Sequence, residues 1–86
     1  MEYTISRHAQ TEMQRRNITL SQVESVLDNP QQILLEREGL KVYQSKVEFS
    51  NSKIFLLRII IVDDVDPKVV ITVYRTSKIE KYWSES

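Results

Sequence analysis

The spacing of apolar residues along the chain changes near residue 31. Before that point apolar positions recur every three or four residues, as in Ile5, Ala9 and Met13, which is the spacing of one side of an α-helix. After it, runs rich in β-branched and aromatic residues have the character of β-strands. The pattern therefore predicts two helices followed by a sheet, in a single domain spanning residues 1–86.

Polar residues mark the ends of both expected helices. Ser6 can cap the first helix, which is expected to run to about Arg16. Thr19 and Gln22 have the spacing of a capping box at the start of the second helix. The second helix is expected to stop at the sequence DNP, because Pro30 disfavours a helical conformation of the residue before it.

Four strands are expected in the second part of the chain, at residues 31–37, 40–49, 53–62 and 68–77. The stretches EG, SNS and DDVDP between them have turn compositions, so the strands should form an antiparallel meander. We expect an α+β fold in which two N-terminal helices pack on one face of a four-stranded antiparallel sheet. The other face should be partly open to solvent and able to hold a site. The stretch YTI can add a short strand before the first helix.

Alternation along the third and fourth strands sorts their side chains between the two faces of the sheet. The residues expected on the core face are Phe55, Leu57, Ile59, Ile61, Ile71 and Val73. Arg58 and Tyr74 then share the opposite face as a pair formed by a cation and a phenol. The alternative interpretation is that Arg58 is a solvated residue of the sheet that simply lies over Tyr74.

Composition narrows the classes of function. Twelve basic residues balance twelve acidic ones, so RNA binding would have to come from local clustering. The absence of cysteine excludes disulfides and thiolate metal sites and fits a reducing cytoplasm. One histidine and one glycine leave no metal cluster and no glycine-rich phosphate loop. No apolar run is long enough for a membrane helix, and MEYTIS is not a signal peptide. We expect no cofactor, no metal and no membrane association.

The first helix carries two residues of chemical interest. His8 is the only histidine, and histidine exchanges protons readily near neutral pH, although a surface position is the simpler interpretation. Arg16 falls on the apolar side of the helix, so its guanidinium is expected to be substantially buried where the helix meets the sheet. A buried arginine needs a partner of opposite charge or a hydrogen-bond acceptor. The residues alone favour a salt bridge to an acid such as Glu12 or Glu36 over a bound phosphate.

The C-terminal stretch YRTSKIEKYW interleaves basic and aromatic residues. Arg75, Lys78 and Lys81 alternate there with aromatic side chains. This arrangement suits contacts to phosphates and unstacked bases of RNA. It is equally typical of an amphipathic segment that packs its aromatic residues.

Several stretches, taken in order, resemble a bacterial family of domains of unknown function that is grouped with BrnT-type and RelE-like toxins. They are RHAQTEMQRRNIT, VESVLDNPQQIL, KVYQ, LLRIIIV and VVITVYRTSKIEKYW, and together they cover nearly the whole chain. The resemblance implies a RelE/BrnT-like fold and a metal-independent endoribonuclease that cleaves mRNA. Two positions depart from the family: Glu12 stands where an arginine is frequent, and Asn17 where a glycine is frequent. Glu12 can neutralise Arg16, or can itself take part in proton transfer.

The resemblance also implies roles for individual residues in attack by a ribose 2′-hydroxyl on the adjacent phosphate. His8 would act as acid or base with Tyr74 as its partner, and the cations would bind the phosphate. The expected catalytic residues are His8, Arg16, Arg58, Tyr74 and Lys78. The expected RNA-binding residues are Lys41, Arg75 and Lys81.

The partners that the resemblance implies are a cognate antitoxin protein, as in type II toxin–antitoxin systems, and an RNA substrate, free or on the ribosome. It leaves the oligomeric state open. The alternative is a non-catalytic protein-interaction module that binds through its open sheet face or sheet edge, which near-zero net charge slightly favours.

Overall fold

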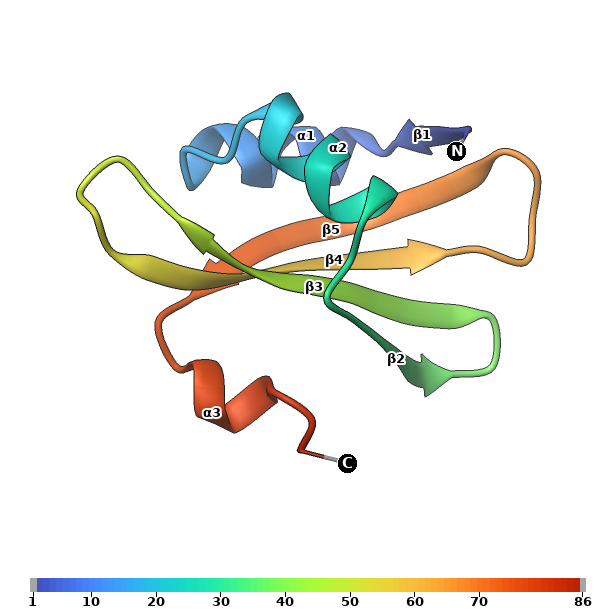
Figure 1. Cartoon of the computed structure of the whole chain (residues 1–86). Helices are drawn as coiled ribbons and strands as arrows, with labels where there is room; N and C mark the ends of the chain where they lie inside the picture. The colour runs from blue at the N-terminus through green and yellow to red at the C-terminus, as the bar shows by residue number, and fades with distance from the viewer. Residues whose placement is uncertain (1, 86) are drawn as a thin grey trace.

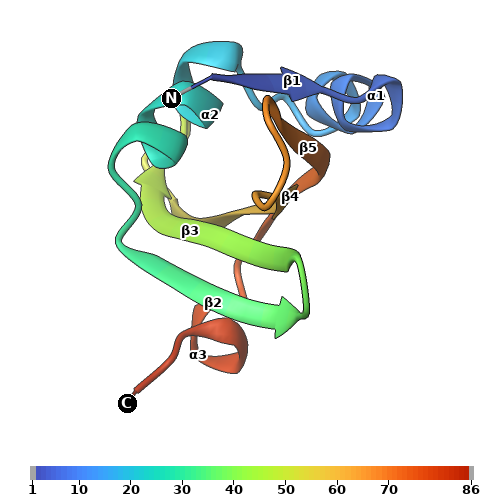
Figure 2. The same ribbon diagram turned by 90° about the vertical axis from the view of Figure 1, so that its right-hand side faces the viewer.

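The computed structural model of the chain describes residues 2–85 and places helices on both faces of one sheet (Figure 1). The elements are β1 (Tyr3–Ile5), α1 (Arg7–Arg15), α2 (Leu20–Asp28), β2 (Gln32–Arg37), β3 (Leu40–Glu48), β4 (Ile54–Val62), β5 (Lys68–Thr76) and α3 (Ile79–Tyr82). We call the sheet face under α1 and α2 the helix face, and the opposite face, against which α3 lies, the α3 face. Figure 2 shows that the sheet curls, with α2 between β1 and β3.

The expected α+β class is confirmed, and the details of the sheet differ. The strand order is β1-β5-β4-β3-β2, in which β2 to β5 form the expected antiparallel meander. β1, the stretch YTI, adds a fifth strand parallel to β5, so the sheet is mixed. A four-stranded sheet with two helices was therefore an incomplete prediction. The short strand expected at YTI is therefore present, although its parallel pairing with β5 was not predicted, and the four residues of α3 are too few for a hydrophobic period to reveal.

Both helices begin at the residues that their sequences predict. The Ser6 hydroxyl accepts a hydrogen bond from the Ala9 amide at 3.0 Å. The capping box is complete, because the Thr19 hydroxyl accepts from the Gln22 amide at 3.1 Å and the Gln22 side chain accepts from the Thr19 amide at 2.9 Å. Asn17 follows α1 with a φ of 55°, the left-handed conformation that asparagine tolerates. None of the helices within residues 2–85 is long and apolar enough to cross a membrane.

We expect the Thr19→Ala variant to lose about 1 kcal/mol of unfolding free energy, because the Gln22 amide then has no capping acceptor. Urea unfolding of the purified variant measures this loss. Ser21→Ala is the matched control, since Ser21 is exposed in the same helical turn and alanine favours helix there. Equal stability of Thr19→Ala and the wild type would show that the cap adds nothing.

The core lies between the helix face and the two N-terminal helices. Its fully buried aliphatic residues are Ala9, Val23, Leu27, Leu57, Ile59, Ile61, Val70 and Val73. These side chains come from α1, α2, β4 and β5, so the core joins the N-terminal helices to the two central strands. The predicted core face of the third expected strand is thereby confirmed.

The fourth expected strand departs from strict alternation at Ile71. Ile61 pairs with Val70 while Ile60 pairs with Thr72, so Ile71 is an extra residue in β5. This irregularity turns both Val70 and Val73 toward the core and leaves Ile71 38% exposed. The prediction that Ile71 belongs to the core was wrong, because the extra residue reverses the alternation on one side of it.

Candidate functional site

Arg58 and Tyr74 form a pair on the α3 face. They lie directly opposite each other in the β4–β5 ladder, and Nη1 of Arg58 donates a hydrogen bond to the Tyr74 hydroxyl at 2.5 Å. Arg58 is only 7% exposed. The prediction that the two side chains share one face is confirmed, and the solvated alternative for Arg58 is wrong.

Gln44 holds the Arg58 guanidinium in place from the neighbouring strand. It is opposite Arg58 in the β3–β4 ladder and fully buried, and its Oε1 accepts from Nε of Arg58 at 2.8 Å. Its Nε2 donates to Oε1 of Gln32 at 2.8 Å and to the Tyr82 carbonyl at 3.1 Å. Sequence reasoning missed Gln44 because only the strand register places it beside Arg58.

The C-terminal segment covers the part of the α3 face that holds Arg58. The Tyr82 ring lies over the Arg58 guanidinium, with 4.3 Å from Cζ to the ring centroid. Tyr82 also meets Tyr74 edge to face, at 6.4 Å between the ring centroids. Gln32 and Ser84 exchange two hydrogen bonds of 2.7 and 3.1 Å. The sequence predicted this face to be partly open with the Arg58–Tyr74 pair on its open surface, and the position of the pair is corrected, since α3 and the residues after it cover Arg58.

Three lysines lie in or next to the C-terminal segment that contains α3. Lys78 directly precedes α3 and Lys81 lies within it, and both are exposed. Nζ of Lys81 is 5.3 Å from the Tyr82 ring centroid, and Nζ of Lys46 is 4.2 Å from that of Trp83. The aromatic residues of the C-terminal stretch thus pack against Arg58 and the lysines, which is the packing alternative for this stretch, and its RNA contacts stay a prediction.

His8 and Arg16 belong to the other side of the sheet. His8 is exposed on α1, which lies over the helix face (Figure 1). The sheet therefore separates His8 from the Arg58–Tyr74 pair, and the expected convergence of His8 with Tyr74 does not occur.

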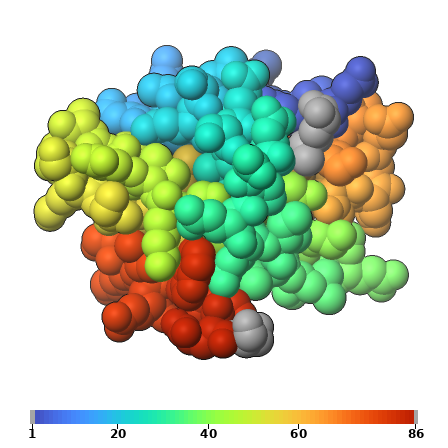
Figure 3. All heavy atoms as spheres, viewed as in Figure 1, coloured from blue at the N-terminus to red at the C-terminus, as the bar shows by residue number. Residues whose placement is uncertain are grey.

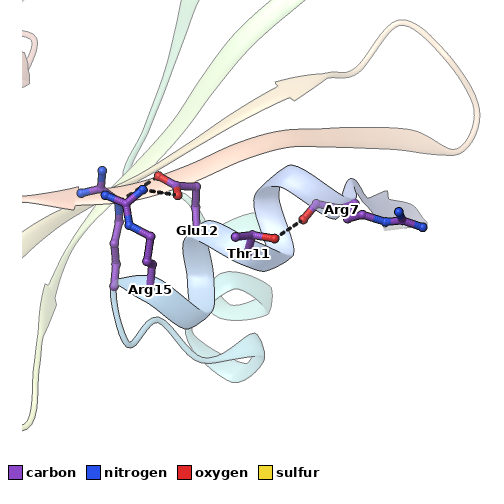
Figure 4. A network of polar contacts seen from close by, with 5 residues as sticks. Arg7, Thr11, Glu12 and Arg15 are labelled. Carbon is purple, nitrogen blue, oxygen red and sulfur yellow. Dashed lines mark hydrogen bonds and ion pairs between the residues drawn. The ribbon is translucent and has the colours of Figure 1, made fainter.

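Glu12 forms ion pairs with the two arginines at the end of α1. It is 9% exposed and pairs with Nη1 of Arg15 at 3.0 Å and with Nε of Arg16 at 3.3 Å. Figure 4 shows Glu12 and Arg15 together near the end of the helix, with the Thr11–Arg7 hydrogen bond one turn earlier.

The expected burial of the Arg16 guanidinium was wrong, because the side chain is 37% exposed. Arg16 caps the helix with non-helical backbone angles, so the helical projection no longer describes it. The salt-bridge alternative with Glu12 is confirmed.

Lys41 also lies on the helix face, opposite the core residue Ile61. Its Nζ is 3.1 Å from Oδ2 of Asp63, which also accepts a hydrogen bond from the Tyr43 hydroxyl at 3.1 Å. Burial raises the pKa of Tyr43, and the neighbouring Asp63 carboxylate raises it further. Lys41 thus has a local structural partner and lies apart from Lys81.

Arg75 packs on aromatic rings of the helix face. It is opposite the core residue Leu57, and its Cζ is 4.3 Å from the Phe49 ring centroid and 4.6 Å from that of Phe55. Of the expected RNA-binding residues, only Lys81 therefore shares a face with the Arg58–Tyr74 pair.

The arrangement on the α3 face is suited to binding an anion. The fixed guanidinium of Arg58 offers charge and planar donors to a phosphate. The Tyr74 hydroxyl accepts a hydrogen bond from Arg58, so its own O–H can still be donated to a ligand. Within residues 2–85, no three histidine, aspartate or glutamate side chains gather as metal ligands would.

Fold and site together define a small α+β domain in which a buried arginine and a half-buried tyrosine are paired on one sheet face. Residues 5–75 match the family model described as Domain of unknown function (DUF4258), and the chain belongs to this family. No curated protein and no solved structure is significantly similar to it. The matched residues include Arg58 and Tyr74 and end before α3.

Proposed function

We propose that the chain is an RNA-cleaving toxin of a type II toxin–antitoxin pair, related to BrnT and RelE-like toxins. It would act in the cytoplasm on mRNA and be neutralised by a cognate antitoxin. The observation that carries this proposal is the buried Arg58 guanidinium, hydrogen-bonded to Tyr74 on a face where lysines and aromatic rings gather. The resemblance of the sequence to toxin families supports the same assignment.

The proposed chemistry assigns distinct tasks to three residues of the α3 face. Cleavage through the ribose 2′-hydroxyl needs a base, an acid for the 5′ oxygen and positive charge for the phosphorane. Arg58 supplies the charge in a fixed orientation, and Lys78 adds an exposed cation from just beyond β5. Tyr74 donates its proton to the leaving oxygen, water accepts the proton of the attacking 2′-hydroxyl, and solvent then returns a proton to Tyr74. His8 and Arg16 have no part in this step, because α1 lies on the opposite face.

We expect expression of the wild type to slow growth and to create new transcript 5′ ends, and the Tyr74→Phe variant to lose both effects. Removing the phenolic proton donor should slow cleavage about 10²- to 10⁴-fold, the usual contribution of general acid catalysis. Tyr43→Phe is the matched control, since it makes the same change on the helix face. Normal growth and unchanged 5′ ends with the wild type would overturn the proposal.

A second candidate is a non-catalytic protein-interaction module, and the free edge of β2 favours it. Ile33 and Leu35 are 51% and 72% exposed on this strand, which ends the sheet. Edge strands with exposed apolar residues are suited to pairing with a strand of a partner protein. Normal growth at high expression, with a partner bound along β2, would favour this function over the toxin.

A further inference from the structure

We propose that residues 79–85 form a removable cover over the Arg58–Tyr74 pair, so that an RNA phosphate reaches Arg58 only after this segment lifts. We call this segment the C-terminal cover. The inference rests on the proposed function and deepens it, because it names what controls access to the proposed site.

The cover closes the approach to the guanidinium. Nε of Arg58 donates to Gln44 and Nη1 donates to Tyr74, so two sides of the group face protein acceptors. The Tyr82 ring occupies a planar face, 4.3 Å from Cζ. Arg58 is therefore only 7% exposed, which leaves too little surface for a phosphate oxygen at hydrogen-bond distance. The bonds to Gln44 and Tyr74 use two of the five N–H donors of a guanidinium, and a phosphate can take others.

The cover is held by hydrogen bonds to two glutamines of the sheet. Gln32 accepts from the Ser84 amide at 3.1 Å and donates to the Ser84 carbonyl at 2.7 Å. Gln44 donates to the Tyr82 carbonyl through Nε2 while its Oε1 holds Arg58. Lifting the cover breaks the bonds to Ser84 and to the Tyr82 carbonyl. It leaves the bond between Oε1 of Gln44 and Arg58 intact, so Arg58 stays aimed at Tyr74 when the site opens.

The cover is also the least anchored helical part of the fold. α3 has four residues, none of them buried, and its N-terminus has no side-chain capping bond. By contrast, α1 and α2 are both capped by side chains and each contributes buried residues to the core. In Figure 3 the C-terminal segment lies as a separate layer against the β2–β3 region. A short helix without buried residues can open locally without unfolding the core.

Modification of Arg58 by phenylglyoxal, mapped by mass spectrometry on the purified full-length chain, tests the cover directly. We expect Arg58 to react several-fold faster in Tyr82→Ala and in Gln32→Ala than in the wild type, because each change removes a contact that holds the cover. Arg37, exposed on β2, serves as an internal reference whose rate stays constant. Glu80→Ala is the matched control, since Glu80 is an exposed residue of α3.

Unchanged Arg58 reactivity in both folded variants would overturn the cover, as would a wild-type Arg58 that already reacts as fast as Arg37. If Tyr82→Ala fails to fold, Gln32→Ala carries the test, because the half-buried Gln32 side chain bonds to Ser84 and to Gln44 and makes no hydrogen bond to Arg58 itself.

Cleavage of an RNA oligonucleotide by the same proteins separates this inference from the proposed function. Faster Arg58 modification together with faster cleavage supports both. Faster modification without cleavage by any of the proteins supports the cover and overturns the ribonuclease. Cleavage with unchanged Arg58 modification supports the ribonuclease and overturns the cover.

Discussion

The Arg58→Ala variant is expected to lose RNA cleavage by about 10²- to 10³-fold, the cost of removing one preorganised group that stabilises charge in a transition state. Arg58 is suited to that role because Gln44 and Tyr74 fix its guanidinium, so little reorganisation is needed when a phosphate binds. The loss should appear in the cleavage rate of the purified protein and as normal growth on expression. Mapped transcript 5′ ends should then match those of cells without the protein.

Two further variants make the result specific. Arg58→Lys keeps the charge but cannot donate to Gln44 and Tyr74 in the planar geometry of a guanidinium, so it should recover only part of the activity. Arg37→Ala removes an exposed arginine from β2 and should cleave like the wild type. Circular dichroism confirms that each variant is folded. A folded Arg58→Ala variant with wild-type cleavage would contradict the proposed site.

The Ile59→Ala variant is expected to lose about 2 to 5 kcal/mol of unfolding free energy, because it opens a cavity in the centre of the core. Ile59 is fully buried on β4, with Tyr43 and Val73 opposite it on the flanking strands. A loss of this size is a large share of the roughly 5 to 15 kcal/mol that stabilises a typical domain. Urea unfolding at constant temperature measures it.

Ile71→Ala is the matched control, since it deletes the same atoms from a neighbouring strand. Ile71 is 38% exposed at the irregularity in β5, so its loss should stay below about 1 kcal/mol. A strictly alternating β5 would instead make the two losses similar. Equal destabilisation by the two variants would therefore contradict the observed register.

The sequence by itself determined the elements whose signals are local. Ser6 sets the start of α1, and the Thr19–Gln22 capping box sets the start of α2, each through side chains within three residues of the helix start. Period-two runs between turn compositions placed the four strands of the meander to within one residue at each end. The same alternation put Arg58 and Tyr74 on one face. These features depend on neighbouring residues, so a single sequence contains them.

Only the tertiary structure decided the features that depend on distant partners. The extra residue at Ile71 became visible through the pairing of β5 with β4, and the parallel pairing of β1 with β5 joins opposite ends of the chain. Gln44 became part of the site through strand register, and Tyr82 through the return of the C-terminus across the α3 face. Hydrogen bonds and ring contacts of this kind are made in space and leave no period along the sequence. The sequence therefore indicated the arginine–tyrosine pair, and the fold determined what holds it and what covers it.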